Sequence, residues 1–194
     1  MLRPLNSNKK LQAYIIGVAL GDGNLSNPNG RATRLCITCD RKYPRLIRKM
    51  RNAIKLLLPK NKVSLQRRHR TFLDISCYSN YWPKLLGWNA KKGSKFSQKV
   101  SIPCWIKRNK QYIVECLRGL FETDGSIYLD RGYKMVMFTS IIPNLANDVY
   151  NLITSLGFKP HIYKLKQNNK SNLYHIRVSK NISEFLNLIK LKKR

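Results

Sequence analysis

IIGVALGDG occupies residues 15–23 of the chain, and LRGLFETDG occupies residues 117–125. Both stretches are apolar, contain small residues and end in Asp-Gly. In each stretch two small residues stand four positions apart, so on a helix they share one face. They are Gly17 and Gly21 in the first stretch, and Gly119 and Thr123 in the second. Because small residues let two helix backbones approach closely, the pattern predicts two helices that pack together, as in a dimer folded from one chain.

Other blocks of the sequence repeat in the same order. LCITC at 35–39 corresponds to VMFTS at 136–140, YPRLI at 43–47 to IPNLA at 142–146, and DISCYS at 74–79 to HIRVSK at 175–180. The members of every pair lie about a hundred residues apart. Such self-similarity is the signature of a duplicated structural unit.

Both copies predict the same order of elements. Helical apolar spacing covers residues 9–21 and 110–124, the second with Asn109 as a candidate N-cap. A hairpin follows each Asp-Gly, and then come a helix that begins at Pro44 or Pro143, a second hairpin and a short helix. We therefore predict an α+β fold of two αββαββα repeats related by a pseudo-twofold axis.

The repeats also suggest the domain organisation. We place the first repeat at residues 1–87 and the second at residues 103–194. Residues 88–102, rich in Lys, Ser and Gly, are expected to form the linker between them.

Net charge is the strongest signal in the composition. The 194 residues include 38 Lys and Arg against 9 Asp and Glu, a formal net charge of +29 spread along the whole chain. This balance predicts a polyanionic partner, above all nucleic acid, and a ribosomal-type RNA-binding protein is one form of it. A membrane surface is disfavoured as partner, because the apolar helix faces are committed to a core.

The apolar runs and the cysteines bear on the compartment. No run approaches the length that a bilayer requires, and the first residues lack an apolar signal segment. Five cysteines without such a segment indicate reduced thiols. A zinc site at CITC is disfavoured, because strand geometry sends Cys36 and Cys39 to opposite faces. We expect an intracellular protein, in the cytoplasm of a prokaryote or in an organelle.

Pairing of the two helices has an electrostatic consequence. It brings Asp22 and Asp124 together at two helix C-termini, where each helix dipole already places partial negative charge. Divalent cations relieve that repulsion, and Mg²⁺ is usually held by a few carboxylates together with phosphates. Such ions promote hydrolysis of phosphodiesters.

The two motifs and the repeated αββαββα plan resemble the LAGLIDADG homing endonucleases in their monomeric two-motif form. The resemblance implies a saddle of two antiparallel sheets, with the motif helices at its centre, that grips double-stranded DNA along a long, imperfectly palindromic site. It implies a monomer that cuts both strands to leave short 3′ overhangs during intron homing. The implied cofactor is Mg²⁺, with Mn²⁺ expected to replace it and Ca²⁺ expected to bind without supporting cleavage.

The resemblance also assigns roles to residues. Asp22 and Asp124 would be the catalytic metal ligands, joined by the main-chain carbonyls of Gly21 and Thr123. Lys95 and Lys192 are candidates for the basic residue that assists catalysis near the end of each repeat. Glu122 stands where the first copy has Leu20, which favours a structural or capping role. The positions where many members carry Gln or Lys hold Cys39 with Asp40, and Ser140, so that support is missing here or comes from elsewhere.

Strand alternation predicts which side chains face the DNA. The expected core positions are Leu35, Ile37, Val63, Leu65, Leu73, Ile75 and Cys77, then Ile127, Leu129, Val136, Phe138, Ile176 and Val178. The expected DNA-facing positions are Arg34, Thr38, Gln66, Arg68, Asp74, Ser76 and Tyr78, then Ser126, Tyr128, Met137, Thr139, Lys164, Lys166, His175 and Arg177. These residue types suit base edges in a major groove. Because the two sets differ, the half-sites should differ in sequence.

Two other functions fit the same fold. One is an RNA-binding splicing cofactor, a maturase, that acts on the protein's own intron RNA. The other is a DNA-binding protein that does not cleave. Retention of both helix-end Asp residues favours the endonuclease, because a pure binder gains nothing from two repelling carboxylates.

Overall fold

The computed structural model describes residues 6–168 and 170–191, and it contains two repeats of the predicted plan. The first repeat comprises α1 (Lys9–Asp22), β1 (Gly23–Ser26), β2 (Arg34–Asp40), α2 (Pro44–Leu57), β3 (Val63–Arg67), β4 (Phe72–Tyr78) and α3 (Trp82–Leu86). The second comprises α5 (Lys110–Thr123), β5 (Gly125–Asp130), β6 (Tyr133–Ser140), α6 (Pro143–Ser155), β7 (Pro160–Gln167), β8 (Lys170–Val178) and α7 (Ile182–Ile189). A short helix that the sequence did not suggest, α4 (Cys104–Lys107), precedes α5. The predicted α+β class is confirmed.

Local signals fix where the helices begin. The Asn8 side chain accepts a hydrogen bond from the Leu11 amide at the start of α1. Asn109, the predicted cap of α5, accepts from the amides of Gln111 and Tyr112. Pro44 and Pro143 open α2 and α6, where the missing N–H costs nothing.

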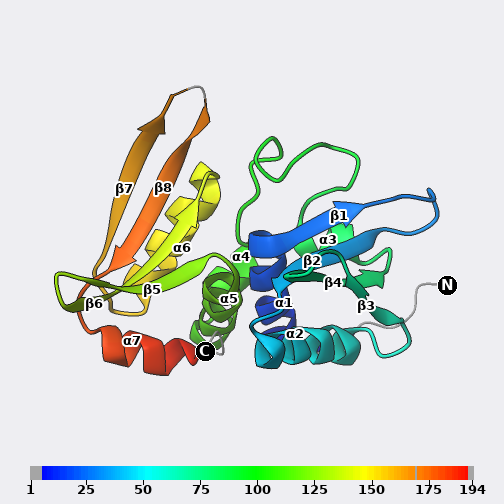
Figure 1. The fold of residues 1–194 in the computed structure, drawn as a ribbon, viewed down its shortest axis with the longest axis horizontal. Coiled ribbons are helices and arrows are strands. Elements are labelled where there is room, and N and C mark those ends of the chain that lie inside the picture. The colour runs from blue at the N-terminus through cyan, green and yellow to red at the C-terminus, as the bar shows by residue number, and fades with distance from the viewer. Residues whose placement is uncertain (1–5, 169, 192–194) are drawn as a thin grey trace.

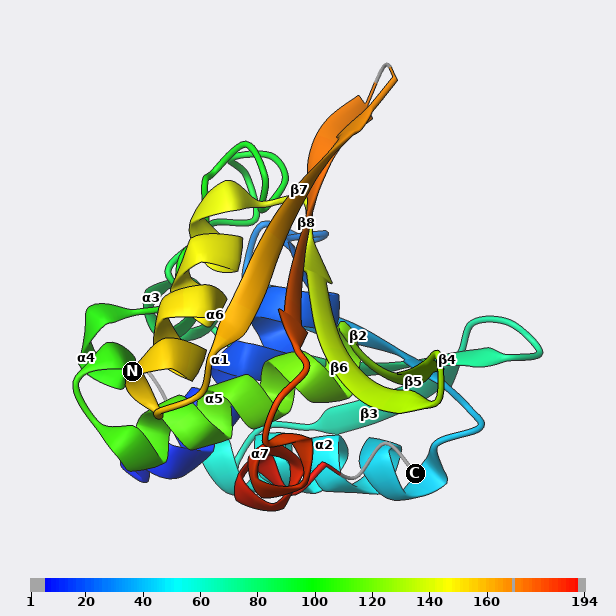
Figure 2. The same ribbon diagram turned by 90° about the vertical axis from the view of Figure 1, so that its left-hand side faces the viewer.

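Each repeat forms one antiparallel sheet. Sheet A has the strand order β1-β2-β4-β3, and sheet B has the equivalent order β5-β6-β8-β7. Figure 1 shows α1 and α5 side by side at the centre, with one sheet on either side. The hairpin of β7 and β8 extends well beyond the rest of the molecule (Figure 2).

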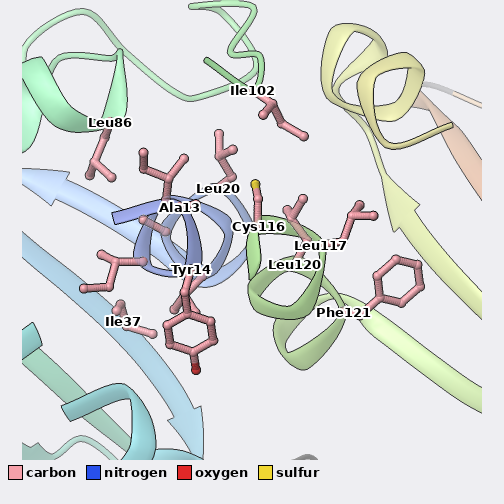
Figure 3. Packing of buried hydrophobic residues seen from close by; sticks show 14 of the residues in the cluster. Ala13, Tyr14, Leu20, Ile37, Leu86, Ile102, Cys116, Leu117, Leu120 and Phe121 are labelled. Carbon is pink, nitrogen blue, oxygen red and sulfur yellow. The ribbon is translucent and has the colours of Figure 1, made fainter. Parts of the chain in front are cut away.

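The contact between α1 and α5 depends on the small residues of the motifs. A Cβ added to Gly119 would lie 2.5 Å from the Tyr14 carbonyl oxygen and 2.6 Å from the Val18 amide nitrogen. A Cβ on Gly17 would meet the Cys116 carbonyl in the same way. Around this crossing, side chains from both helices enter one continuous core (Figure 3). The predicted helix packing is confirmed.

Residues 88–102 contain neither helix nor strand, but they pack against both repeats. Val100 and Ile102 are buried in the core. The Ile102 amide donates a 2.7 Å hydrogen bond to Asp148 Oδ2 on α6, and Lys95 reaches the end of α1. The segment thus contributes to the fold as well as joining its halves.

Two predicted core residues are exposed instead. Leu65 is 44% exposed and Leu129 is 72% exposed. Leu65 lies on the edge strand β3, and Leu129 lies beside the β5–β6 turn, where the helices do not cover the sheets. Strand alternation gave the face of each residue, but not how far the covering helices extend.

In the described part of the chain, no helix has both the length and the apolar character needed to cross a bilayer.

Candidate metal centre and nucleic-acid interface

The ends of the two motif helices lie beside each other. α1 ends at Asp22, which is exposed, and Asp124, which is half-buried, follows α5 directly. A Cβ added to Gly21 would lie 3.1 Å from Asp124 Oδ2 and would collide with the Thr123 hydroxyl. The helix packing that the small residues permit therefore brings together the acidic ends of both motifs.

Two hollows flank these helix ends, and they are reciprocal. One is lined by Asp22 of the first motif, Thr123 of the second and the end of β2. The other is lined by Asp124 of the second motif, Gly21 of the first and the end of β6. Each hollow thus combines the motif Asp of one repeat with the residue that immediately precedes the motif Asp in the other repeat. A pseudo-twofold axis requires this exchange.

Lys95 distinguishes the two hollows. Its ammonium group donates to the carbonyl oxygens of Ala19 at 3.3 Å, Leu20 at 2.6 Å and Gly21. Burial lowers the pKa of Lys95 below its ordinary value, and the carboxylates of Asp124 and Asp22 oppose that shift. A cation here is favoured because three carbonyls converge at the negative end of α1. The other candidate lysine, Lys192, lies outside the described residues.

The donor atoms at the helix ends fit a hard divalent cation. They are two carboxylates and main-chain carbonyls, all oxygen, which is the chemistry that Mg²⁺ and Mn²⁺ accept. Within residues 6–168 and 170–191, no group of three or more His, Cys, Asp or Glu side chains forms a closed metal cage. An ion at this centre would complete its coordination with phosphate oxygens and water.

Glu122 belongs to a buried cluster that the sequence did not reveal. The residue is 1% exposed, and its carboxylate accepts hydrogen bonds from the Lys49 ammonium at 2.8 Å and 2.9 Å. The Tyr14 hydroxyl donates a third, at 2.8 Å, and the Lys49 ammonium lies 4.3 Å from the centre of the Tyr14 ring. Glu122 of the second repeat is thereby fixed to α1 and α2 of the first. No sequence signal identifies Lys49, because only the tertiary structure brings it to Glu122.

The predicted DNA-facing side chains of sheet A form a connected surface. Thr38 Oγ1 donates to Asp74 Oδ1 at 2.8 Å and accepts from Arg68 at 3.2 Å. Arg34 of β2 donates to Gln66 Oε1 of β3 at 3.3 Å, across the intervening strand β4. Tyr78 is exposed at the end of β4, opposite Arg34. These hydrogen bonds orient the polar groups before any ligand arrives.

Ser76 lies on this face but is only 4% exposed. It pairs with Cys36 on one side and Ser64 on the other, in the middle of sheet A. Its neighbours therefore cover it, and the predicted direct contact of Ser76 with DNA disagrees with the structure.

The corresponding face of sheet B centres on Met137, which is paired with Ser126 and Arg177. The His175 ring nitrogen Nδ1 lies 2.9 Å from the Met137 sulfur, and the Tyr128 hydroxyl lies 4.0 Å from it. The other predicted residue on this face is Thr139, which pairs with His175 and lines the hollow of Asp124.

Lys164 lies on the opposite face of sheet B from the one that strand alternation predicts. It pairs with Tyr174, so it lies on the face of Ile176, which is buried, and not on that of His175. Lys166 lies where the register shifts between Leu165 and Gln167. Apolar residues do not alternate regularly in β7, so the sequence alone does not indicate which of its side chains share a face.

Two residues of β7 that strand alternation did not predict lie on the candidate interface of sheet B. Tyr163 pairs with His175, and His161 pairs with Arg177. The Arg177 guanidinium donates to the Tyr163 hydroxyl at 3.1 Å and lies over its ring at 5.3 Å. His161 stacks beside Tyr163. The register of β7 against β8 was the information needed to find them.

Family models match both halves of the chain. A model described as a LAGLIDADG-like domain matches residues 111–190. A second, described as a WhiA LAGLIDADG-like domain, matches residues 11–76.

One curated relative is a much longer protein. The tRNA-splicing ligase RtcB of Methanopyrus kandleri is 24% identical over 201 residues. The match covers 90% of this chain but only 20% of the ligase. The chain therefore corresponds to about a fifth of that relative.

Solved structures share the fold at low sequence identity. I-DmoI, in complex with DNA and Mn, matches with a TM-score of 0.68 and 19% identity, over 93% of this chain and 96% of that one. The N-terminal LAGLIDADG domain of DUF199/WhiA matches with a TM-score of 0.62 and 13% identity, over 97% and 86% of the two chains.

Proposed function

The chain is a two-motif member of the LAGLIDADG family, and from this premise we propose that it is a metal-dependent, site-specific endonuclease for double-stranded DNA. The observation that carries the proposal is the reciprocal pair of hollows at the helix ends. One hollow presents Asp22 beside Thr123, and the other presents Asp124 beside Gly21. Two equivalent centres related by a pseudo-twofold axis suit two strands of a duplex, one cut at each.

Asp22 and Asp124 would hold divalent metal, with main-chain carbonyls of Gly21 and Thr123 as further ligands. For the Gly21 carbonyl to bind metal, it would exchange its contact with the Lys95 ammonium for the ion. When bound, such an ion offsets phosphate charge and favours deprotonation of the attacking water. Lys95 places a second positive charge beside Asp124, where it can stabilise charge that develops on the scissile phosphate. Mg²⁺ is the proposed ion, Mn²⁺ should replace it, and Ca²⁺ should bind without supporting cleavage.

The two sheets would position the duplex. The polar face of sheet A and the Met137 face of sheet B offer different residue types, so they suit two dissimilar halves of a long, imperfect palindrome. The Lys and Arg residues, which far outnumber the acidic ones, would contact phosphates and fix the register. We propose that a monomer cuts both strands and leaves short 3′ overhangs.

The direct test is a cleavage assay on DNA that carries the uninterrupted form of the gene's own insertion locus. The parent protein and its Asp22→Asn, Asp124→Asn and Glu184→Gln variants are compared with Mg²⁺ and with EDTA. Glu184 is an exposed acid on α7 and serves as the matched control. We expect each Asp variant to lose at least about 100-fold in rate while still binding the duplex, because an oxygen ligand is lost. Cleavage that persists in EDTA or in both Asp variants contradicts the proposal.

The alternative is a DNA-binding protein that does not cleave. The halves match different family models, and the first matches the one described for WhiA. The same assay decides between the endonuclease and the DNA-binding protein. Tight, sequence-specific binding with no cleavage under any divalent ion supports the DNA-binding protein.

A further inference from the structure

Lys95 is presented by an ordered turn of the segment that joins the two repeats. The Ser97 amide donates to the Ser94 hydroxyl at 3.1 Å, and the Val100 amide donates to the Lys95 carbonyl at 3.2 Å. Val100 is buried in the core, so the turn is anchored on that side. The backbone thus directs the Lys95 side chain to the end of α1, whereas Lys92 in the same segment is exposed.

In this arrangement the Lys95 ammonium has no donor left for a phosphate. A lysine ammonium carries three N–H donors and no acceptor. Three carbonyl oxygens accept from it, those of Ala19 at 3.3 Å, Leu20 at 2.6 Å and Gly21. A phosphate oxygen that entered the hollow of Asp124 would gain a hydrogen bond from Lys95 only if one of these three were given up. Lys95 must therefore change partners before it acts on DNA.

The Gly21 carbonyl is the partner that a divalent ion would contest. Gly21 directly precedes Asp22 and lines the same hollow as Asp124 and Lys95. The carboxylates of Asp124 and Asp22 attract the ammonium, as they would attract a metal ion. Two cations on one carbonyl oxygen would lie close together and repel each other. Binding of either cation to Gly21 therefore disfavours the other.

From these contacts we propose that Lys95 competes with the divalent ion for the Gly21 carbonyl. In the metal-free protein the ammonium offsets the negative end of α1 and the two carboxylates beside it. When metal binds, Lys95 gives up Gly21, and the freed N–H is then available to the scissile phosphate. This inference rests on the proposed function, because it requires a metal site at Asp22 and Asp124. It adds an order of events, in which Lys95 reaches the phosphate only after metal has bound.

Binding of Mn²⁺ in the absence of DNA tests the competition. The free ion is measured by its electron paramagnetic resonance signal during a titration with protein. The test variant is Lys95→Met, whose side chain has neither the charge nor the N–H donors. The control is Lys92→Met, which removes the same charge from an exposed position in the same segment. Thermal unfolding in EDTA verifies that both variants fold.

We expect Lys95→Met to bind Mn²⁺ about tenfold more tightly than the parent, because no neighbouring cation has to be displaced. Lys92→Met should bind as the parent does. Equal affinity of Lys95→Met and the parent overturns the competition but leaves the metal centre intact, and weaker binding by Lys95→Met does the same. An equal gain in both variants also overturns it, because the gain would then reflect total charge. Absence of Mn²⁺ binding in all three proteins contradicts the metal centre itself, and the inference falls with it.

A second measurement follows the ammonium group in the unmutated protein, so it does not depend on the stability of Lys95→Met. NMR of the lysine side-chain nitrogens detects hydrogen-bonded ammonium groups, and Lys95→Arg assigns the Lys95 signal. Lys49, which is bound to Glu122, is the internal reference. At Ca²⁺ concentrations that displace Mn²⁺, we expect the Lys95 signal to shift or broaden and the Lys49 signal to stay unchanged. A Lys95 signal that does not respond to Ca²⁺ would show that both cations bind together, which contradicts the exchange.

Discussion

At the scale of single residues, the buried carboxylate of Glu122 joins the two repeats. Its partner Lys49 has a side chain that is 27% exposed, whereas the Glu122 side chain is fully buried. We expect Lys49→Met to destabilise the protein by about 3 kcal/mol, because it leaves a buried charge with less compensation. Adding Glu122→Leu, the residue that the first repeat carries as Leu20, should recover much of this loss. A double-mutant cycle of urea unfolding measures the coupling, and additive effects would show that the pair is not coupled.

Cysteine reactivity is a second property of single residues. Cys104 is exposed, whereas Cys39, Cys77 and Cys116 are buried. Burial raises the pKa of Cys77 to about 11 and that of Cys39 to about 12, so both remain neutral thiols near pH 8. Because the thiolate is the reactive form, iodoacetamide should label Cys104 first and the buried three only after unfolding. Peptide mass spectrometry reads the order, and early labelling of Cys116 would contradict the helix packing.

At the scale of elements, the crossing of α1 and α5 has no room for a larger residue. Gly119→Ala places a methyl group 2.5 Å from the Tyr14 carbonyl, so the helices must separate. We expect a loss of about 3 kcal/mol or more in the free energy of unfolding, together with weaker Mn²⁺ binding, since separation moves Asp22 away from Asp124. Asn187→Ala, at an exposed helical position on α7, is the control and should be neutral. Unchanged stability in Gly119→Ala would mean that this crossing is loose.

The elements also show what the sequence could predict. Both motif helices, the four hairpins and the α1–α5 contact followed from local signals, namely apolar period, caps, turns and small residues. The sequence did not show which side chains of β7 lie on which face of the sheet, because β7 is exposed on both faces and contains a register shift. The pairing of Lys49 with Glu122 and the exposure of Leu65 did not follow from local signals either. Both depend on where one element ends against another, which no local pattern encodes.

At the scale of the whole molecule, Lys and Arg greatly outnumber the acidic side chains that could neutralise them in internal ion pairs. The net charge is +29, and the candidate face of sheet A compensates part of its own charge through Asp74. The remaining cations should release counterions from nucleic acid on binding. The protein therefore gains affinity from its total charge, and specificity from the few side chains that the sheets orient.

Salt dependence tests this division. If about 6–10 phosphates are contacted, the affinity for duplex DNA should fall by roughly 10³–10⁵ between 50 and 200 mM salt. Fluorescence anisotropy at fixed Ca²⁺, the ion expected to bind without supporting cleavage, measures the slope for the target duplex and for a scrambled one. The two slopes should be similar, because phosphate contacts carry no sequence information, whereas the target should bind more tightly at every salt concentration. An affinity that does not change with salt would contradict a phosphate-binding role for the surplus charge, and equal affinity for both duplexes would contradict base reading by the sheets.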